Sequence, residues 1–153
     1  MNRSRYLERN FDKTDRAILN ALAVNARITV RELAQVLNLS APSVAERMRR
    51  LEDRGIIEGY TIIVDAHAVG MTITALIRIR PMPGEAKRIG VMLSETPEVI
   101  EADRVTGDDG FIAKVIVAMM ADLEAMLDRF LPFASVTAAI IQSSLVKRRI
   151  PKI

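Results

Sequence analysis

Arginine side chains are concentrated in one segment of this 153-residue chain, residues 41–54. If the segment is a helix with Val44, Met48 and Leu51 facing inward, its opposite face is polar and cationic. A guanidinium group can bridge O6 and N7 of guanine or clamp a phosphate, and the free amides at a helix start also favour phosphate. The residues that we expect to contact DNA are Ser40, Ser43, Glu46, Arg47, Arg49, Arg50 and Arg54.

The residues before this segment determine how it is interpreted, because an isolated basic helix is usually only a solvated face. Apolar residues at helical spacing predict a first helix over about 14–25. Thr29 and Glu32 form a capping box that opens a second helix, which runs to about Leu37. Ser40 can then cap the third helix after a short turn. Three helices in this arrangement predict a helix-turn-helix over residues 11–59.

The C-terminal half has a different pattern of apolar residues, which predicts four strands and two helices. We expect strands at 71–80, 99–105, 111–120 and 136–146, and helices at about 85–95 and from Asp122 onward. This βαββαβ order is the ferredoxin-like pattern, with both helices on one face of an antiparallel sheet. The other sheet face is then left to be buried, which favours dimerisation. The chain is therefore expected to be an α+β protein.

Two further segments flank the three predicted helices. Residues 1–10 carry three arginines and no apolar period, so we expect a flexible N-terminal arm that can touch phosphate. Residues 56–64 are apolar and broken at Gly59, which predicts a small β wing or a connector strand. We expect a connector strand and linker over 60–70 and the second domain over 71–153.

Composition limits the classes of function. Half of the residues are hydrophobic, the formal net charge is +3, and cysteine is absent, which excludes disulfides and cysteine-ligated zinc. The longest apolar run, 111–121, contains Lys114 and is far short of the roughly 20 residues of a transmembrane helix. With no signal peptide at the start, we expect a cytoplasmic protein with no membrane contact, no cofactor and no metal.

Several short motifs carry a more specific resemblance, and together they are similar to the Lrp/AsnC (feast/famine) regulators over residues 11–150. The motifs are Thr14-Asp15-Arg16-x-Ile18-Leu19, Asn25-Ala26-Arg27, Glu32-Leu33-Ala34, Leu39-Ser40, Val44-x-x-Arg47-Met48-x-x-Leu51-Glu52-x-x-Gly55-Ile56-Ile57, Gly59-Tyr60, Val105-Thr106-Gly107-Asp108 and Val146-Lys147.

The resemblance implies an N-terminal winged helix-turn-helix and a C-terminal ligand-sensing and oligomerisation domain of the βαββαβ (RAM) type. It further implies a homodimer that assembles to an octamer, double-stranded DNA as partner, and an amino acid or related metabolite as effector. Effector contact falls on the tip of the second hairpin, where amides can hold a carboxylate and an acid an ammonium. The expected effector residues are Thr106, Gly107, Asp108, Asp109 and Gly110 at this tip, with Gln142 and Ser144 of the last strand lining the same pocket.

The sequence departs from the family pattern at two places. Members often carry a second acid two residues after the first, whereas this chain has Gly110 there and places Asp109 one position earlier. The family commonly has Pro-Gly-Val before the last strand, where this chain has Ala134-Ser135-Val136. A tight hairpin also uses Gly and Asp without any ligand, so the tip has a purely structural alternative.

An enzyme and an architectural DNA-binding protein are the two alternatives to a regulator. Asp108 and Asp109 with the only histidine, His67, supply too few ligands for a catalytic metal, and no phosphate-binding loop occurs, so we do not expect an enzyme. An architectural protein that packages DNA without a ligand remains the alternative. The salt dependence and sequence preference of DNA binding separate it from a sequence-specific regulator.

Overall fold

The computed structural model describes residues 11–146 and 149–152. Contacts within the chain define two units, which divide between Ile62 and Ile63, and residues 149–152 group with the N-terminal unit. The expected N-terminal arm, 1–10, lies outside the described residues. Among the described residues, no helix combines the length and the apolar character needed to cross a membrane.

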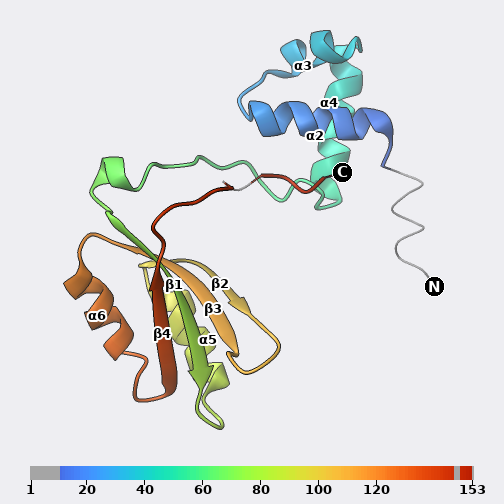
Figure 1. The fold of residues 1–153 in the computed structure, drawn as a ribbon. Coiled ribbons are helices and arrows are strands. Elements are labelled where there is room, and N and C mark those ends of the chain that lie inside the picture. Colours follow the sequence, from blue (N-terminus) through green and yellow to red (C-terminus); the bar gives the residue numbers. More distant parts are fainter. Residues whose placement is uncertain (1–10, 147–148, 153) are drawn as a thin grey trace. The chain divides into compact units, whose positions relative to one another are not determined.

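The N-terminal unit contains three helices, α2 (Lys13–Val24), α3 (Val30–Leu37) and α4 (Ala41–Asp53) (Figure 1). Each begins at a residue whose side-chain oxygen accepts a hydrogen bond from a backbone N–H of the first turn: Asp12, Thr29 and Ser40. One apolar stripe from each helix forms the core. Its fully enclosed members include Ile18, Leu33, Val44 and Leu51. The predicted helix-turn-helix is therefore present.

The turn between α3 and α4 is set by Asn38, which adopts a left-handed conformation with φ 53°. Its side chain is short and polar, which makes this region more accessible to asparagine than to most residues. The Leu39 N–H then donates to the Ala34 carbonyl at 2.9 Å, which closes the C-terminal end of α3. The chain is thereby redirected into α4 within a few residues.

The prediction of a β wing or connector strand after α4 is wrong for this chain taken alone. No strand occurs between α4 and Thr72 in the described structure, and the segment contains only a 3-10 turn, His67–Val69. Ile62 and Ile63 are more than four-fifths exposed. β-branched residues favour extended backbone, but a strand also needs a neighbour to accept its hydrogen bonds.

Tyr60 connects this segment to α4, because its hydroxyl donates to Glu52 Oε1 at 2.8 Å. Burial of the phenol, together with this bond, raises the pKa of Tyr60 to about 12. The bond's contribution to stability is complete below the ordinary tyrosine value near 10 and is lost as the pH rises towards 12.

We expect an ultraviolet titration to show one tyrosine that ionises near pH 12 and becomes easier to ionise in Glu52→Gln protein. The Tyr60→Phe variant assigns this transition, because the chain has two tyrosines. If the high transition persisted in Tyr60→Phe protein, the assignment would be wrong.

The C-terminal unit is a four-stranded antiparallel sheet with strand order β2-β3-β1-β4 (Figure 1). Its elements in chain order are β1 (Ile73–Pro81), α5 (Ala86–Glu95), β2 (Val99–Arg104), β3 (Phe111–Val117), α6 (Met120–Asp128) and β4 (Ala134–Ile140). Alternate residues of β1 and β3 are buried against Ile89 of α5 and Met126 of α6. The expected βαββαβ arrangement, with both helices on one face, is confirmed.

Several predicted boundaries in this unit are wrong. Strand β3 ends at Val117 instead of 120, because α6 already begins at Met120. Helix α6 begins at Met120, so Asp122 is its third residue rather than its cap, and its carboxylate accepts the Met119 N–H at 3.2 Å. Strand β4 ends at Ile140 instead of 146: its pairing with β1 ends at Ala75 opposite Ile140, and β1 itself begins only two residues earlier, at Ile73. Residues that follow lack a strand to pair with, apart from the Ile141 N–H, which donates to the Thr74 carbonyl.

Candidate functional site

The N-terminal end of α4 is open to solvent and carries part of the predicted DNA-contacting set. Ser40 is exposed, and its Oγ accepts the N–H of the half-buried Ser43 at 3.3 Å. One and two turns further along, Glu46 and Arg49 are exposed and form an ion pair with each other. Arg54 is the C-cap residue at the opposite end of the helix. Ser40, Ser43, Glu46 and Arg49 thus follow one another at three-residue spacing from the N-cap of α4 to its ninth residue.

Two other arginines of α4 turn towards α2 and converge on Asp15, which is fully buried. Arg47 Nη1 donates to Asp15 Oδ1 at 2.9 Å and to Asp12 Oδ2 at 2.7 Å. Arg50 Nη2 donates to both Asp15 oxygens, at 3.0 and 2.9 Å. Hydrogen bonds between ionised groups are the strongest in proteins, particularly where water is excluded. We call this group the Asp15 cluster: Asp12, Asp15, Arg47 and Arg50.

The Asp15 cluster corrects the predicted reading face. Arg50 was expected to face outward opposite Val44 and Leu51, and this placement is wrong because its guanidinium is bound to a buried carboxylate of α2. Arg47 likewise contacts α2, and its hydrogen bond is the largest cause that holds the pKa of Asp12 below its ordinary value. Both arginines therefore fix the orientation of α4 against α2.

The sequence contains one signal for this cluster, the position of Asp15. Asp15 precedes Ile18 and Leu22 by three and seven residues, so it lies on the same inward stripe of the first helix. An acid on an apolar stripe needs a cationic partner, because an unpaired buried charge is very costly. Two of the arginines in residues 41–54 were the available partners.

The hairpin between β2 and β3 closes at residues 106–110. The Val105 N–H donates to the Gly110 carbonyl at 2.9 Å, and Gly107 and Gly110 have φ 97° and 72°. A Cβ on Gly110 would lie 2.8 Å from Pro81 Cδ. A side chain at position 110 would therefore require Pro81 to shift, and it would also be strained by the positive φ of this residue.

Asp108 lies at the exposed end of this hairpin. Its backbone carbonyl accepts a hydrogen bond from Arg80 Nε at 2.9 Å, and its carboxylate lies 3.7 Å from Arg80 Nη2. Thr106 and Gly107 are exposed, whereas Asp109 and Gly110 are half-buried. The tip thus presents an exposed carboxylate beside a cation and loop amides.

The expected pocket shared by this tip with Gln142 and Ser144 is not formed within one chain. The tip adjoins Ile79 and Pro81 at one end of β1. Gln142 and Ser144 follow the end of β4, which pairs with Ala75 near the other end of β1. At about 3.4 Å per residue, the two groups are separated by roughly 20 Å. Gln142 and Ser144 are exposed and lie beyond the last strand.

Comparisons with known proteins match both units. A family model described as "Winged helix-turn-helix DNA-binding" matches residues 11–58, and one described as "Lrp/AsnC ligand binding domain" matches residues 74–151. The chain belongs to the Lrp/AsnC family. The relatives that match this chain are transcription regulators. This protein is therefore a DNA-binding transcription regulator and not an enzyme.

Curated Lrp/AsnC-type relatives align with nearly the whole chain. An HTH-type transcriptional regulator of Bacillus subtilis, YezC, is 34% identical over 87% of this chain and 94% of its own length. The regulator Rv2324 of Mycobacterium tuberculosis is 35% identical over 92% and 97%.

Solved structures agree with this assignment. LrpC of B. subtilis superposes with a TM-score of 0.85 at 26% identity, covering 90% of this chain and 98% of its own. A feast or famine regulatory protein of M. tuberculosis, solved in complex with L-methionine, has a TM-score of 0.83 at 31% identity and covers 92% and 98%. The resemblance suggested by the sequence motifs is therefore confirmed.

Proposed function

We propose that this Lrp/AsnC regulator contacts double-stranded DNA through α4, with Ser40, Ser43, Glu46 and Arg49 along the helix from its N-cap to its ninth residue. The observation that carries this proposal is the division of arginines on α4: the Asp15 cluster holds the helix from one side, and Arg49 remains exposed on the other. When Arg49 leaves Glu46 and bonds to a phosphate or a guanine edge, its guanidinium keeps a hydrogen-bond partner, because both groups offer acceptors to its planar fork. Arg54 extends the basic surface at the end of the helix.

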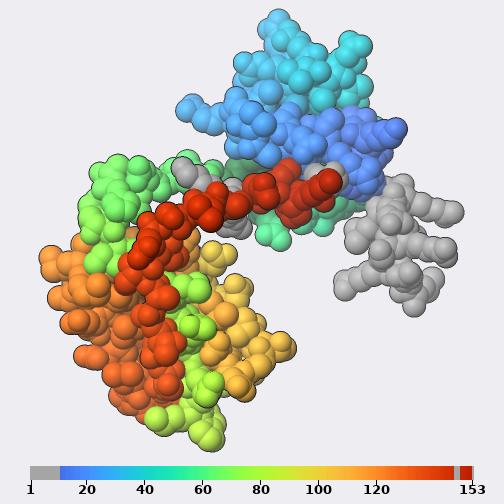
Figure 2. All heavy atoms as spheres, viewed as in Figure 1, coloured from blue at the N-terminus to red at the C-terminus, as the bar shows by residue number. Residues whose placement is uncertain are grey.

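We further propose that the protein is a homodimer, assembling to an octamer, and that the open sheet face forms part of an interface. We define the open sheet face as the outward residues Leu76, Arg78, Ile112, Lys114, Thr137 and Ala139. Strands β1 and β4, which carry part of it, lie side by side in Figure 2. Apolar Leu76 and Ile112 alternate with charge on this face, and burial against a second copy removes them from water. Sedimentation equilibrium tests the assembly.

An amino acid is the effector that we propose, with the hairpin tip 106–110 as a contact. Its support is the exposed Asp108 carboxylate beside Arg80 and the L-methionine complexes solved for two structural neighbours, one from Neisseria meningitidis and one from M. tuberculosis. Gln142 and Ser144 join this contact only if a second chain supplies them. We also propose a cytoplasmic location, which is supported by the assignment to DNA-binding transcription regulators.

The experiment is a gel shift of genomic fragments, repeated with L-methionine and other single amino acids at several salt concentrations. We expect one fragment class to bind preferentially and its affinity or complex size to change with an amino acid. In Asp108→Ala protein, the change is expected to disappear, because the ammonium loses its acceptor, while the DNA-contacting helix is untouched. An undiminished response would move the effector away from the tip. Binding without sequence preference would instead favour an architectural role.

A further inference from the structure

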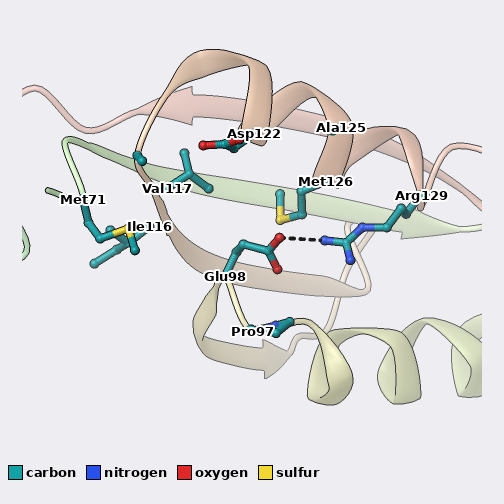
Figure 3. A pocket seen from close by; sticks show the side chains of 10 residues that line it. Met71, Pro97, Glu98, Ile116, Val117, Asp122, Ala125, Met126 and Arg129 are labelled. Atoms are coloured by element: carbon teal, nitrogen blue, oxygen red, sulfur yellow. Dashed lines mark hydrogen bonds and ion pairs between the residues drawn. The ribbon is translucent and has the colours of Figure 1, made fainter.

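The N-terminal unit carries an apolar groove beside α2. It has a volume of about 750 Å³ and lies between α2 and the segment that follows α4, with Leu19, Ile57 and Tyr60 in its wall. The cavity beside α6 in the other unit is smaller, about 510 Å³, and its Glu98 and Arg129 side chains are paired with each other (Figure 3). The groove is therefore the hollow whose apolar wall gains most from a cover.

The C-terminal segment of the chain reaches this groove. Ile150 and Pro151 belong to its lining, and residues 149–152 group with the N-terminal unit. The exposed fraction of the apolar side chains that lead into the segment falls from 96% at Leu145 to 63% at Val146 and 41% at Ile150. Ile150 is therefore the side chain of these three that the protein covers most.

The dipeptide Ile150-Pro151 suits a segment that docks without a strand partner. Proline fixes its own φ and directs the preceding residue to extended backbone, so less conformational entropy is lost when the segment is ordered. Proline also lacks an N–H, which leaves one donor fewer to satisfy outside a sheet. Ile150 then supplies a branched apolar side chain to the apolar wall. These properties favour docking by apolar contact over the addition of a strand.

We propose that residues 149–152 form a docking segment that anchors the C-terminal end of its own chain in this groove. The occupant is identified by its position, because Ile150 and Pro151 line the groove and the same unit contains the segment. The chain thus passes from the N-terminal unit to the sheet and then returns. The docking segment adds a second connection between the DNA-binding unit and the C-terminal unit, in addition to the segment that follows α4.

This second connection is the shorter of the two. Nine residues lead from Ile141, whose N–H still bonds to the sheet, to Ile150, and an extended chain of this length spans at most about 30 Å. Thirteen residues lead from Tyr60, which is bonded to Glu52 of α4, to Ile73 at the start of β1, and they span up to about 45 Å. Docking therefore sets the upper limit on how far the DNA-binding unit can move from the sheet, and release of the segment extends that limit.

Disulfide trapping in the full chain tests the docking directly, because the chain has no cysteine of its own. Ile150→Cys is combined with Ala23→Cys or with Gly59→Cys, which line the groove from α2 and from the segment after α4. Ala23 is exposed, and a Cβ at Gly59 meets nothing within 4 Å. The control pairs Ile150→Cys with Val24→Cys, which is 91% exposed and outside the groove. We expect a groove pair to form its disulfide about tenfold faster than the control, because the bond requires Cα atoms within about 7 Å.

A denaturing gel run without reductant shows which chain supplies the segment. A disulfide within one chain runs as a monomer, and this is the expected result. A disulfide between two chains would place the segment of a second copy in the groove and would overturn the assignment to the chain's own end. Equal trapping rates for the groove pairs and the control pair would overturn the docking itself.

Hydrogen exchange provides a second test that leaves the groove itself unchanged. Ile150→Asp places a charge against the apolar wall, so we expect the amides of residues 56–61 to exchange about fivefold faster as the segment leaves. The helices should stay folded, because Ile150 is not part of the three-helix core. The matched control is Leu145→Asp, the same change at a side chain that is already 96% exposed, which should leave exchange as in the wild type. Equal exchange in Ile150→Asp and wild-type protein would overturn the proposal, and neither test depends on DNA or on an amino acid.

Discussion

Replacing Asp15 with alanine is expected to lower the free energy of unfolding of the N-terminal unit by about 3 kcal/mol, the lower end of the range for breaking a buried ion pair. The change leaves two guanidinium groups without their common acceptor. Arg47 and Arg50 retain partial contact with solvent, at 26% and 39% exposure, which is why the lower end applies. Hydrogen exchange of the amides in α2 and α4 measures this loss separately from the sheet.

The matched control is Asp53→Ala, which removes an acid from an exposed position in the last turn of α4. It should change stability by no more than about 0.5 kcal/mol. In the double variant Asp15→Ala/Arg50→Ala, the second substitution should cost much less than it does alone, because both residues act in one network. Additive losses would show that Arg50 has another role, and an unchanged Asp15→Ala protein would contradict the cluster's structural importance.

The Asp15 cluster could not be predicted from local sequence patterns. Caps and periodicity are local properties, so Thr29 with Glu32 located the start of α3, and Ser40 located that of α4. The partners of Asp15 lie 32 and 35 residues away, and no local pattern states which face of α4 meets α2. In the sequence, the exposed Arg49 is therefore indistinguishable from Arg47 and Arg50, which are bonded to Asp15.

Failures in the C-terminal half have a similar origin. The apolar residues up to Val146 read as strand, but strand length is limited by the partner, and β1 ends its pairing with β4 at Ala75. Gly110 was predicted as an effector contact where the family often has an acid, and no local pattern shows that a Cβ at this position would lie 2.8 Å from Pro81 Cδ.

Removal of the Arg49 side chain is expected to weaken binding to a specific DNA fragment by about 1 to 3 kcal/mol without unfolding the protein. Arg49 is exposed on α4 and its ion pair is with Glu46 of the same helix, so its loss does not open the core. Exposed ion pairs of this kind contribute little to stability. Fluorescence anisotropy of a labelled fragment measures the affinity, and circular dichroism follows the fold.

The control for charge is Arg104→Ala, which removes one exposed arginine from β2 in the other unit and should leave the affinity near that of the wild type.

Salt dependence then distinguishes the two kinds of contact that Arg49 can make. If it binds a phosphate, the variant weakens binding to all sequences and the slope of affinity against salt falls by about one. If it binds a base edge, discrimination between specific and random fragments falls instead. Equal affinity of wild-type and Arg49→Ala protein for every fragment would remove Arg49 from the interface and leave the start of α4, at Ser40 and Ser43, as the contact.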